Sequence, residues 1–342
     1  MNLPDYNFLS APLWLITVLH ILTLTLHFVA MNFLVGGLVI ILWGKFQHRW
    51  ENPTVQQFIA LFPTAMAATV TLGVAPLLFV QLVFHRQVYS AAIVSGWFWL
   101  GIIFAVLIGY YFLYGATSSK QIAPARRRIY LIVALLMFLY VSKVYSSVFS
   151  MAERPGLISS LYAQCQSGLT LNPMIGDYIW RWLHMMLGAL TVGGFFVGLI
   201  GRDNPEAYRV GRGFFLWGMV LASAAGLGYM FSLSEFLVPF MRSPGIWMVT
   251  LGVVLSAGSL HFFFRKRFLM AGLMLFVSML SMVTTRHFLR LVKLGGQFEP
   301  SSLPVKPQWS VFILFLVFFI IALLTVLYML KLFFTSRQAS AK

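Results

Sequence analysis

The sequence predicts an all-α integral membrane protein, a nine-helix transmembrane bundle with its N-terminus outside and its C-terminus in the cytoplasm. Of the 342 residues, 60% are hydrophobic and only 9% are charged, and the mean hydropathy is +0.87. Soluble domains carry about 45–50% apolar and about 25% charged residues, so this composition excludes an ordinary globular protein. The apolar residues form long runs and the basic residues cluster between the runs, a pattern typical of membrane proteins.

Nine apolar stretches are long enough to cross a membrane, which takes roughly 20 mostly apolar residues in a helix. The first runs from Pro12 to Gly44, far longer than the apolar core of a signal peptide (about 7–15 residues), and we expect it to be retained as a span. The longest connection, 150–177, predicts a folded surface loop. We expect residues 1–342 to form a single polytopic transmembrane domain. In chain order the predicted spans are 12–43, 64–84, 95–115, 128–149, 178–200, 213–233, 246–264, 268–289 and 309–334.

The basic residues predict the orientation of these spans. The chain has 24 Lys and Arg against 8 Asp and Glu, a net charge of +16. Alternate connections and the C-terminal tail hold 15 of the basic residues, whereas the opposite side holds 6. Cytoplasmic loops carry an excess of Lys and Arg, so the richer side is assigned to the cytoplasm. The charge therefore predicts orientation, and we expect no nucleic-acid partner. The 15 residues are Lys45, Arg49, Lys120, Arg126, Arg127, Arg128, Arg202, Arg209, Arg212, Arg265, Lys266, Arg267, Lys331, Arg337 and Lys342.

The single cysteine, Cys165, excludes an internal disulfide. No C-x-x-C-H sequence is present, which excludes covalent attachment of a c-type haem.

Histidines are the most informative polar residues, because ionisable groups at membrane depth are costly and mark functional sites. Haem iron takes imidazole nitrogen or methionine sulfur as axial ligands, and helix bundles hold cofactors between facing helices. Haem propionates are anionic, and arginines accompany the histidines: Arg181 precedes His184 by three residues, on the same helix face. The histidines expected near the external side are His20, His85, His184 and His287, with His27 about 10 Å deeper than His20 along the same helix face.

Other interpretations of these residues stay open. A single membrane histidine is more often a hydrogen-bonding contact between helices than a ligand. His48, His85 and His261 lie at span ends beside arginines and fit an interfacial role best. Methionines number 17, so packing is the default role of any one of them.

Three stretches resemble the large, haem-bearing subunit of cytochrome bd quinol oxidase, a family with nine spans and an external N-terminus. The fifth span, RWLHMMLGALTVGGFFVGLIGR, is similar to the segment whose histidine ligates the low-spin haem b, which implies that role for His184. The seventh span begins IWMVTLGV and is similar to the segment that supplies the methionine on the other side of that haem, here Met248. In the first span, HFVAMNFLVGG resembles the stretch near the active-site haems, so the resemblance matches His27 rather than His20.

The chain also departs from that family. The family's ligand glutamate, followed three residues later by arginine, is replaced by His287 with Arg290. The third span, GWFWLGIIFAVLIGYYFLYG, lacks the family's proton-handling glutamates, and the external quinol-binding loop shrinks to about ten residues around Ser234–Pro244. A histidine at position 287 favours a six-coordinate, bis-His haem, which transfers electrons without binding gas.

These observations predict a membrane b-type cytochrome subunit with two or more haems b, in a bacterial-type inner (cytoplasmic) membrane. It transfers electrons between the quinone pool and an external-face, periplasmic redox partner. The chain has almost no extramembrane mass, so we expect a multihaem c-type cytochrome or an iron–sulfur subunit as that partner. The predicted haem-iron ligands are His184 with Met248 and His27 with His287; His20 serves a third haem or stacks near the second; Arg181, Arg286 and Arg290 neutralise propionates.

Quinol oxidation also needs a proton acceptor beside the ring. Asp177 and Glu235, at external span ends, are candidates, although a solvated or lipid-headgroup contact explains them equally well. Two other functions stay open: a bd-like terminal quinol oxidase subunit and, in a different class, a proton-coupled transporter or channel.

Overall fold

The computed structural model describes residues 8–117 and 122–339 of the protein. Its regular structure is helical, apart from an isolated bridge between Leu9 and Val305, which confirms the all-α class for these residues. Two of the basic residues counted above, Lys120 and Lys342, and both chain ends lie outside the described residues.

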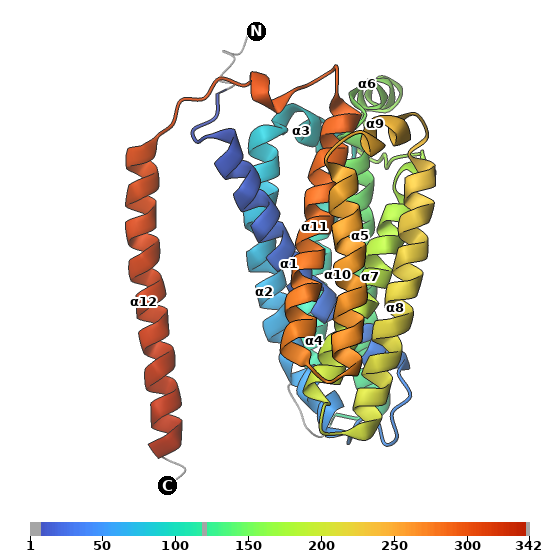
Figure 1. The fold of residues 1–342 in the computed structure, drawn as a ribbon, viewed down its shortest axis with the longest axis vertical. Coiled ribbons are helices and arrows are strands. Elements are labelled where there is room, and N and C mark those ends of the chain that lie inside the picture. The colour runs from blue at the N-terminus through green and yellow to red at the C-terminus, as the bar shows by residue number, and fades with distance from the viewer. Residues whose placement is uncertain (1–7, 118–121, 340–342) are drawn as a thin grey trace. The chain divides into compact units, whose positions relative to one another are not determined.

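The chain divides into two compact units, residues 18–299 and residues 1–17 with 300–342. The single domain expected for the whole chain stays an expectation. In the larger unit, which we call the bundle, the helices are α1 (Leu13–Trp43, whose first residues belong to the smaller unit), α2 (Pro53–Val83), α3 (His85–Val94), α4 (Gly96–Thr117), α5 (Pro124–Met151), α6 (Pro155–Gln164), α7 (Ile179–Ile200), α8 (Pro205–Ser232), α9 (Leu237–Met241), α10 (Gly245–Phe264) and α11 (Phe268–Leu294) (Figure 1).

The smaller unit joins the segment before α1 to the segment before α12 (Trp309–Ala339). The Leu9 amide donates to the Pro304 carbonyl at 2.8 Å, and the Lys306 amide donates back to the Leu9 carbonyl at 2.9 Å. The Lys306 ammonium also lies 5.3 Å from the centre of the Phe8 ring.

Eight helices of the described residues are long and apolar enough to cross a membrane, so the chain is a multi-pass membrane protein. They are α1, α2, α4, α5, α7, α8, α10 and α11, and they coincide with the first eight predicted spans. The ninth predicted span lies in α12, whose described apolar segment Trp309–Ile321 is shorter. Nine spans and the membrane orientation therefore stay predictions.

Two helices begin earlier than hydropathy predicts. Helix α2 starts at Pro53 and α8 at Pro205, in each case directly after an asparagine. The Asn52 side-chain oxygen accepts from the Thr54 amide at 3.0 Å, and the Asn204 oxygen accepts from the Glu206 amide at 3.0 Å. Asparagine at the N-cap followed by proline at the first helical position is a strong helix start, so capping extends both helices beyond their apolar runs.

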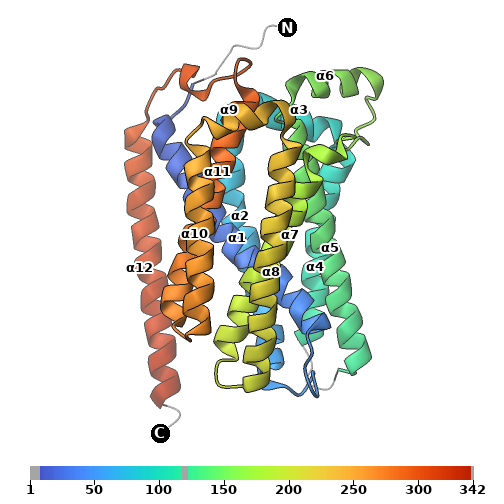
Figure 2. The same ribbon diagram turned by 45° about the vertical axis from the view of Figure 1, so that its right-hand side comes forward.

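Two ends of the bundle differ in character. One end carries α3, α6 and α9, and the other carries the connections 44–52, 201–204 and 265–267 (Figures 1 and 2). We call them the α6 end and the basic end, because the second holds the Lys- and Arg-rich connections. At the basic end, Glu206 accepts from the Gln47 amide at 2.7 Å and from the Asn52 side chain at 3.1 Å, which ties the α1–α2 connection to the start of α8.

The connection 150–177 is folded, as predicted. It contains α6 and then crosses to α7 through residues bonded to the bundle. The Asn172 amide donates to the Ser147 hydroxyl at 2.8 Å, and the Asn172 side chain donates to the Ser150 hydroxyl at 2.8 Å. The Ser95 hydroxyl donates to the Thr170 carbonyl at 2.7 Å.

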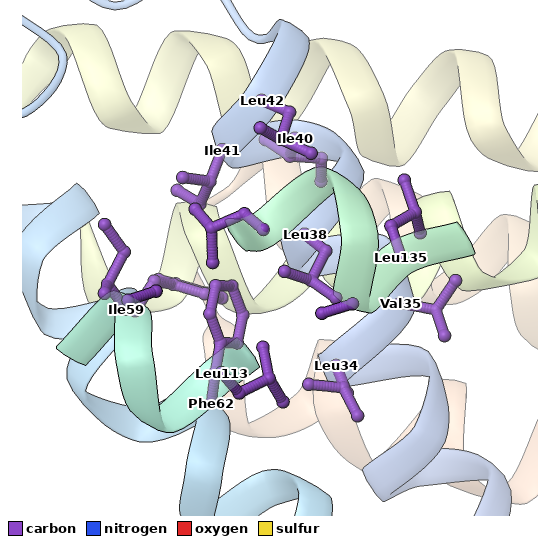
Figure 3. Close-up of a cluster of buried hydrophobic side chains, with 14 of the residues drawn as sticks. Leu34, Val35, Leu38, Ile40, Ile41, Leu42, Ile59, Phe62, Leu113 and Leu135 are labelled. Carbon is purple, nitrogen blue, oxygen red and sulfur yellow. The ribbon is translucent and has the colours of Figure 1, made fainter. Parts of the chain in front are cut away.

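The largest apolar core joins α1, α2, α4, α5 and α7 toward the basic end. Figure 3 shows its centre, where leucine and isoleucine side chains of α1 meet Phe62 of α2, Leu113 of α4 and Leu135 of α5. Three antiparallel pairs, α4 with α5, α7 with α8 and α10 with α11, make the most extensive helix contacts.

Glycines bring α7 close to two neighbours. A Cβ at Gly36 of α1 would collide with the Ala189 carbonyl of α7, and one at Gly193 would lie 2.5 Å from the carbonyl carbon of Gly36. On the other side, a Cβ at Gly211 of α8 would lie 2.7 Å from Cα of Gly198. Small residues serve close helix approach in membranes, and at Gly193 this excludes the alternative of leaving room for a ligand.

Candidate functional site

A buried group of cations surrounds one carboxylate at the α6 end of the bundle. Glu153, two residues after α5, pairs with Lys293 Nζ at 3.4 Å, Arg290 Nε at 3.8 Å and Arg181 Nη1 at 3.9 Å. Arg286 contacts the same carboxylate through Nη2. We call Glu153, Arg181, Arg286, Arg290 and Lys293 the cation cluster.

The cation cluster is buried and carries excess positive charge. Side-chain exposure is 1% for Glu153, 5% for Lys293 and at most 19% for the three arginines. Four cations therefore face a single carboxylate. Buried charges are costly unless each is paired and hydrogen-bonded. The cluster consequently needs further negative charge.

Hydrogen bonding in the cluster is also incomplete. Within the cation cluster, three buried guanidinium nitrogens have no hydrogen-bond partner: Nη1 of Arg181, of Arg286 and of Arg290. Tyr229 of α8 adds one hydroxyl, 3.5 Å from Lys293 Nζ. Anionic oxygens are the partners that arginine forks bind most strongly.

The Glu153 carboxylate is ionised at neutral pH. Burial raises its pKa, but the charges of Arg286, Lys293, Arg181 and Arg290 outweigh burial and lower the pKa to about 2. Its charge therefore offsets one of the four cations at any physiological pH.

The structure brings together the three arginines that the sequence singled out and adds two residues that sequence reasoning missed. Glu153 was overlooked because it lies in a connection, far along the chain from its partners. Lys293 is one of the six basic residues on the side predicted to be external, and its charge was used only for the orientation. The sequence did contain a signal for its role, because Arg286, Arg290 and Lys293 follow the i, i+4, i+7 spacing that places them on one face of α11.

Three histidines share one hydrogen-bonding pattern. Nδ1 of His20 lies 3.0 Å from the Pro76 carbonyl, Nδ1 of His27 lies 2.9 Å from the Thr69 carbonyl, and Nδ1 of His184 lies 2.8 Å from the Ala222 carbonyl. A carbonyl only accepts, so Nδ1 is the donor and Nε2 of the neutral ring keeps its lone pair. Histidines that bind metals commonly donate the other ring nitrogen to a backbone carbonyl in this way, which fixes the tautomer and the ring orientation.

Glycines on neighbouring helices accommodate two of these rings. A Cβ at Gly73 of α2 would lie 2.8 Å from Nδ1 of His27, and a Cβ at Gly226 of α8 would lie 3.0 Å from Nδ1 of His184. At Gly188, one turn after His184, the position of a Cβ has no heavy atom within 4 Å. Space is therefore open on the His184 face of α7.

His287 lies at a depth similar to that of His20. His20 is seven residues after the start of α1 and His287 is seven residues before the end of α11, about 10 Å along each helix. His20 also lies near enough to His287 and Arg290 for their charges to act on it. His27 lies two turns deeper. The remaining predicted ligand, Met248, lies in the first turn of α10 and is half-buried.

The two candidate proton acceptors, Asp177 and Glu235, both form ion pairs with Arg154. Arg154 Nε lies 2.7 Å from Asp177 Oδ2, and Arg154 Nη1 lies 4.0 Å from Glu235 Oε1. The Asp177 side chain is 11% exposed and the Glu235 side chain is 69% exposed. Only Glu235 of this pair is open to the surroundings.

Of the three histidines expected at interfaces, His48 and His261 are exposed, whereas His85, at the start of α3, is partly buried. The His48 side chain is 84% exposed and pairs with Glu51 at 3.9 Å, and His261 is also exposed. In the described ranges, no three His, Cys, Asp or Glu side chains come together in a group that could hold a metal ion. A haem needs only one or two axial side chains from the protein.

Comparison with known proteins finds no match: no family model, no curated protein and no solved structure aligns significantly with the chain.

Proposed function

We propose that the protein is a membrane b-type cytochrome subunit that transfers electrons between the quinone pool and a redox partner at the α6 end. The observation that carries this proposal is the cation cluster, a buried excess of positive charge close to His20 of α1 and His287 of α11. A haem would supply a flat apolar ring, two carboxylates and an iron atom to one site. The unpaired guanidinium nitrogens support the carboxylates, and the histidines bonded through Nδ1 support the iron.

The propionates explain the excess charge. Two carboxylates would bring the negative charges in the cluster to three against four cations, and would supply acceptors for the buried guanidinium nitrogens of Arg181, Arg286 and Arg290. The other class considered, a proton-coupled transporter or channel, requires no fixed dianion at this position.

The histidines supply axial ligands. His184 and Met248 would hold one haem, and no heavy atom lies within 4 Å of a Cβ at Gly188, one turn after His184. His287 would hold a second haem, together with one of the two histidines of α1. The family resemblance favours His27 in that pair, whereas the depth of the side chains and the proximity to Arg290 favour His20. Whichever of His20 and His27 does not pair with His287 would bind a further haem or form only a hydrogen bond between helices.

The bound haem iron supplies one-electron transfer between its ferric and ferrous states. The protein's own groups set the conditions for it. Nδ1-to-carbonyl bonds hold the imidazole planes of His20, His27 and His184 in place, so little reorganisation accompanies a change of charge. The net positive charge of the cation cluster would favour the uptake of an electron by a group bound beside it, and the Glu153 carboxylate would reduce that effect.

Quinol oxidation requires a base that receives a proton. Glu235 is the better candidate of the two carboxylates, because it is exposed and only weakly paired with Arg154. Asp177 is held in a close ion pair with Arg154 and is only 11% exposed. A multihaem c-type cytochrome or an iron–sulfur subunit is the proposed partner, in a bacterial-type inner membrane with the α6 end external.

An anaerobic reduction experiment tests this function. Purified protein is mixed with a reduced quinol analogue, and the haem b α-band is followed in the reduced-minus-oxidised difference spectrum. The proposal predicts partial reduction within the mixing time, and slower reduction in Glu235→Gln than in the exposed control Glu51→Gln. A haem band that quinol does not reduce would contradict quinol oxidation. Rapid carbon monoxide binding with oxygen uptake would instead identify a terminal oxidase.

A further inference from the structure

A second concentration of positive charge lies at the basic end of the bundle, in a hollow of about 440 Å³. Four of its lining residues come from one face of α8, at the spacing i, i+3, i+4 and i+7 from Pro205. The turn between α10 and α11 supplies a fifth. The side chains that matter below are Arg202, Asp203, Tyr208, Arg209, Arg212 and Lys266.

One hydrogen bond and two cation–π contacts hold the side chains of the hollow in place. The Tyr208 hydroxyl donates to the Phe263 carbonyl at 3.2 Å, which joins α8 to the end of α10. Lys266 Nζ lies 5.0 Å from the centre of the Tyr208 ring, and Arg212 Cζ lies 5.8 Å from the centre of the Phe264 ring. Cation–π contacts of this kind hold a cation over a ring while leaving its hydrogen-bond donors free.

The charge in the hollow is unbalanced. Asp203 is the one acidic residue in its lining, and it lies 3.5 Å from Arg202. Arg209, Arg212 and Lys266 have no carboxylate opposite them within the lining. Guanidinium and ammonium groups converging in this way are suited to phosphate oxygens.

Apolar surface continues from the hollow toward the membrane. Phe264, over which Arg212 lies, is 44% exposed, and Val220, eleven residues after Arg209 and on the same face of α8, is 47% exposed. A soluble phosphate would use the cations alone. A phospholipid would use both, its headgroup on the cations and its acyl chains on the apolar surface.

We propose that this hollow binds the phosphate of an anionic phospholipid headgroup. The inference is independent of haem and of electron transfer, because it rests on the other end of the bundle. Neutral phospholipids carry a compensating choline or ethanolamine cation, which would meet Arg209, Arg212 and Lys266 unfavourably, so the site selects lipids with net negative charge.

Native mass spectrometry of the full-length protein in detergent tests the proposal, with phosphatidylglycerol and phosphatidylcholine as probes. We expect tighter binding of phosphatidylglycerol by the wild type, and about fivefold weaker binding for each cation removed in Arg209→Gln, Arg212→Gln and Lys266→Gln. The matched control K45Q/R126Q/R128Q removes three exposed charges from the same end but outside the hollow, and should bind like the wild type.

Two results would overturn the proposal. Equal binding of phosphatidylglycerol by the triple variant R209Q/R212Q/K266Q and by the charge-matched control would show that the hollow is not the site. Displacement of phosphatidylglycerol by inorganic phosphate at equal concentration would assign the cations to a soluble phosphate rather than a lipid. Far-UV circular dichroism of both triple variants checks that each is folded.

Discussion

Glu153 is the residue on which the cation cluster depends when no other anion is bound. Replacing Glu153 by Gln would leave four buried cations without a carboxylate, and breaking a buried ion pair in this way costs about 3–5 kcal/mol. We expect Glu153→Gln to lower the thermal unfolding midpoint in detergent markedly. Glu235→Gln, in which the lost carboxylate is 69% exposed, should change the midpoint little. Equal midpoints for the two variants would contradict the cluster.

The lowered pKa of Glu153 predicts that the folded protein loses stability in acid. In the folded protein the pKa of Glu153 is about 2, below its ordinary value of 4.5, because the four cations outweigh burial. A lowered folded-state pKa contributes stability that is fully present above the ordinary value and is lost as the pH falls toward the folded-state value. The wild-type midpoint should therefore fall more steeply than that of Glu153→Gln between about pH 5 and about pH 3. If the unfolding midpoints of the wild type and Glu153→Gln fell in parallel with pH, Glu153 would not be the cause of the acid sensitivity.

At the scale of single helices, glycine positions make a sharp prediction about His184. A Cβ at Gly226 would lie 3.0 Å from the ring nitrogen that bonds to the Ala222 carbonyl, so Gly226→Ala should displace the imidazole and shift or abolish the haem signal. Gly213→Ala is the matched control on the same helix, since nothing lies within 4 Å of its Cβ position. The control should keep the wild-type spectrum and gain slightly in stability from the better helix former. An unchanged spectrum in Gly226→Ala would count against His184 as a ligand.

Helix positions were predictable because each span is a long apolar run, and the first eight coincide with helices of the bundle. The starts of α2 and α8 were missed because Asn52 and Asn204 extend the helices through polar sequence, where hydropathy carries no signal. The site was predictable in part. Arg286 and Arg290 stand beside a histidine in the sequence, whereas the pairing of Glu153 with α11 depends on tertiary packing across more than a hundred residues.

For the molecule as a whole, Cys165 tests the predicted orientation. It is the only cysteine and is partly exposed in the connection between α6 and α7, at the α6 end. The distribution of basic residues predicts that this end is external, so a membrane-impermeant maleimide should label Cys165 in intact cells that lack an outer-membrane barrier. In the variant K45C/C165S, labelling should require permeabilisation. The reverse pattern would invert the topology and the proposed side of the redox partner.

The most direct test of the central claim is the ratio of haem b to polypeptide, measured by the pyridine haemochrome of the purified protein and of its His184→Ala variant. The proposed function predicts at least two haems b in the wild type and one fewer in His184→Ala, with no change in His261→Ala, where the histidine is exposed at the basic end. A wild type without haem, or a His184→Ala variant with the full complement, would contradict it.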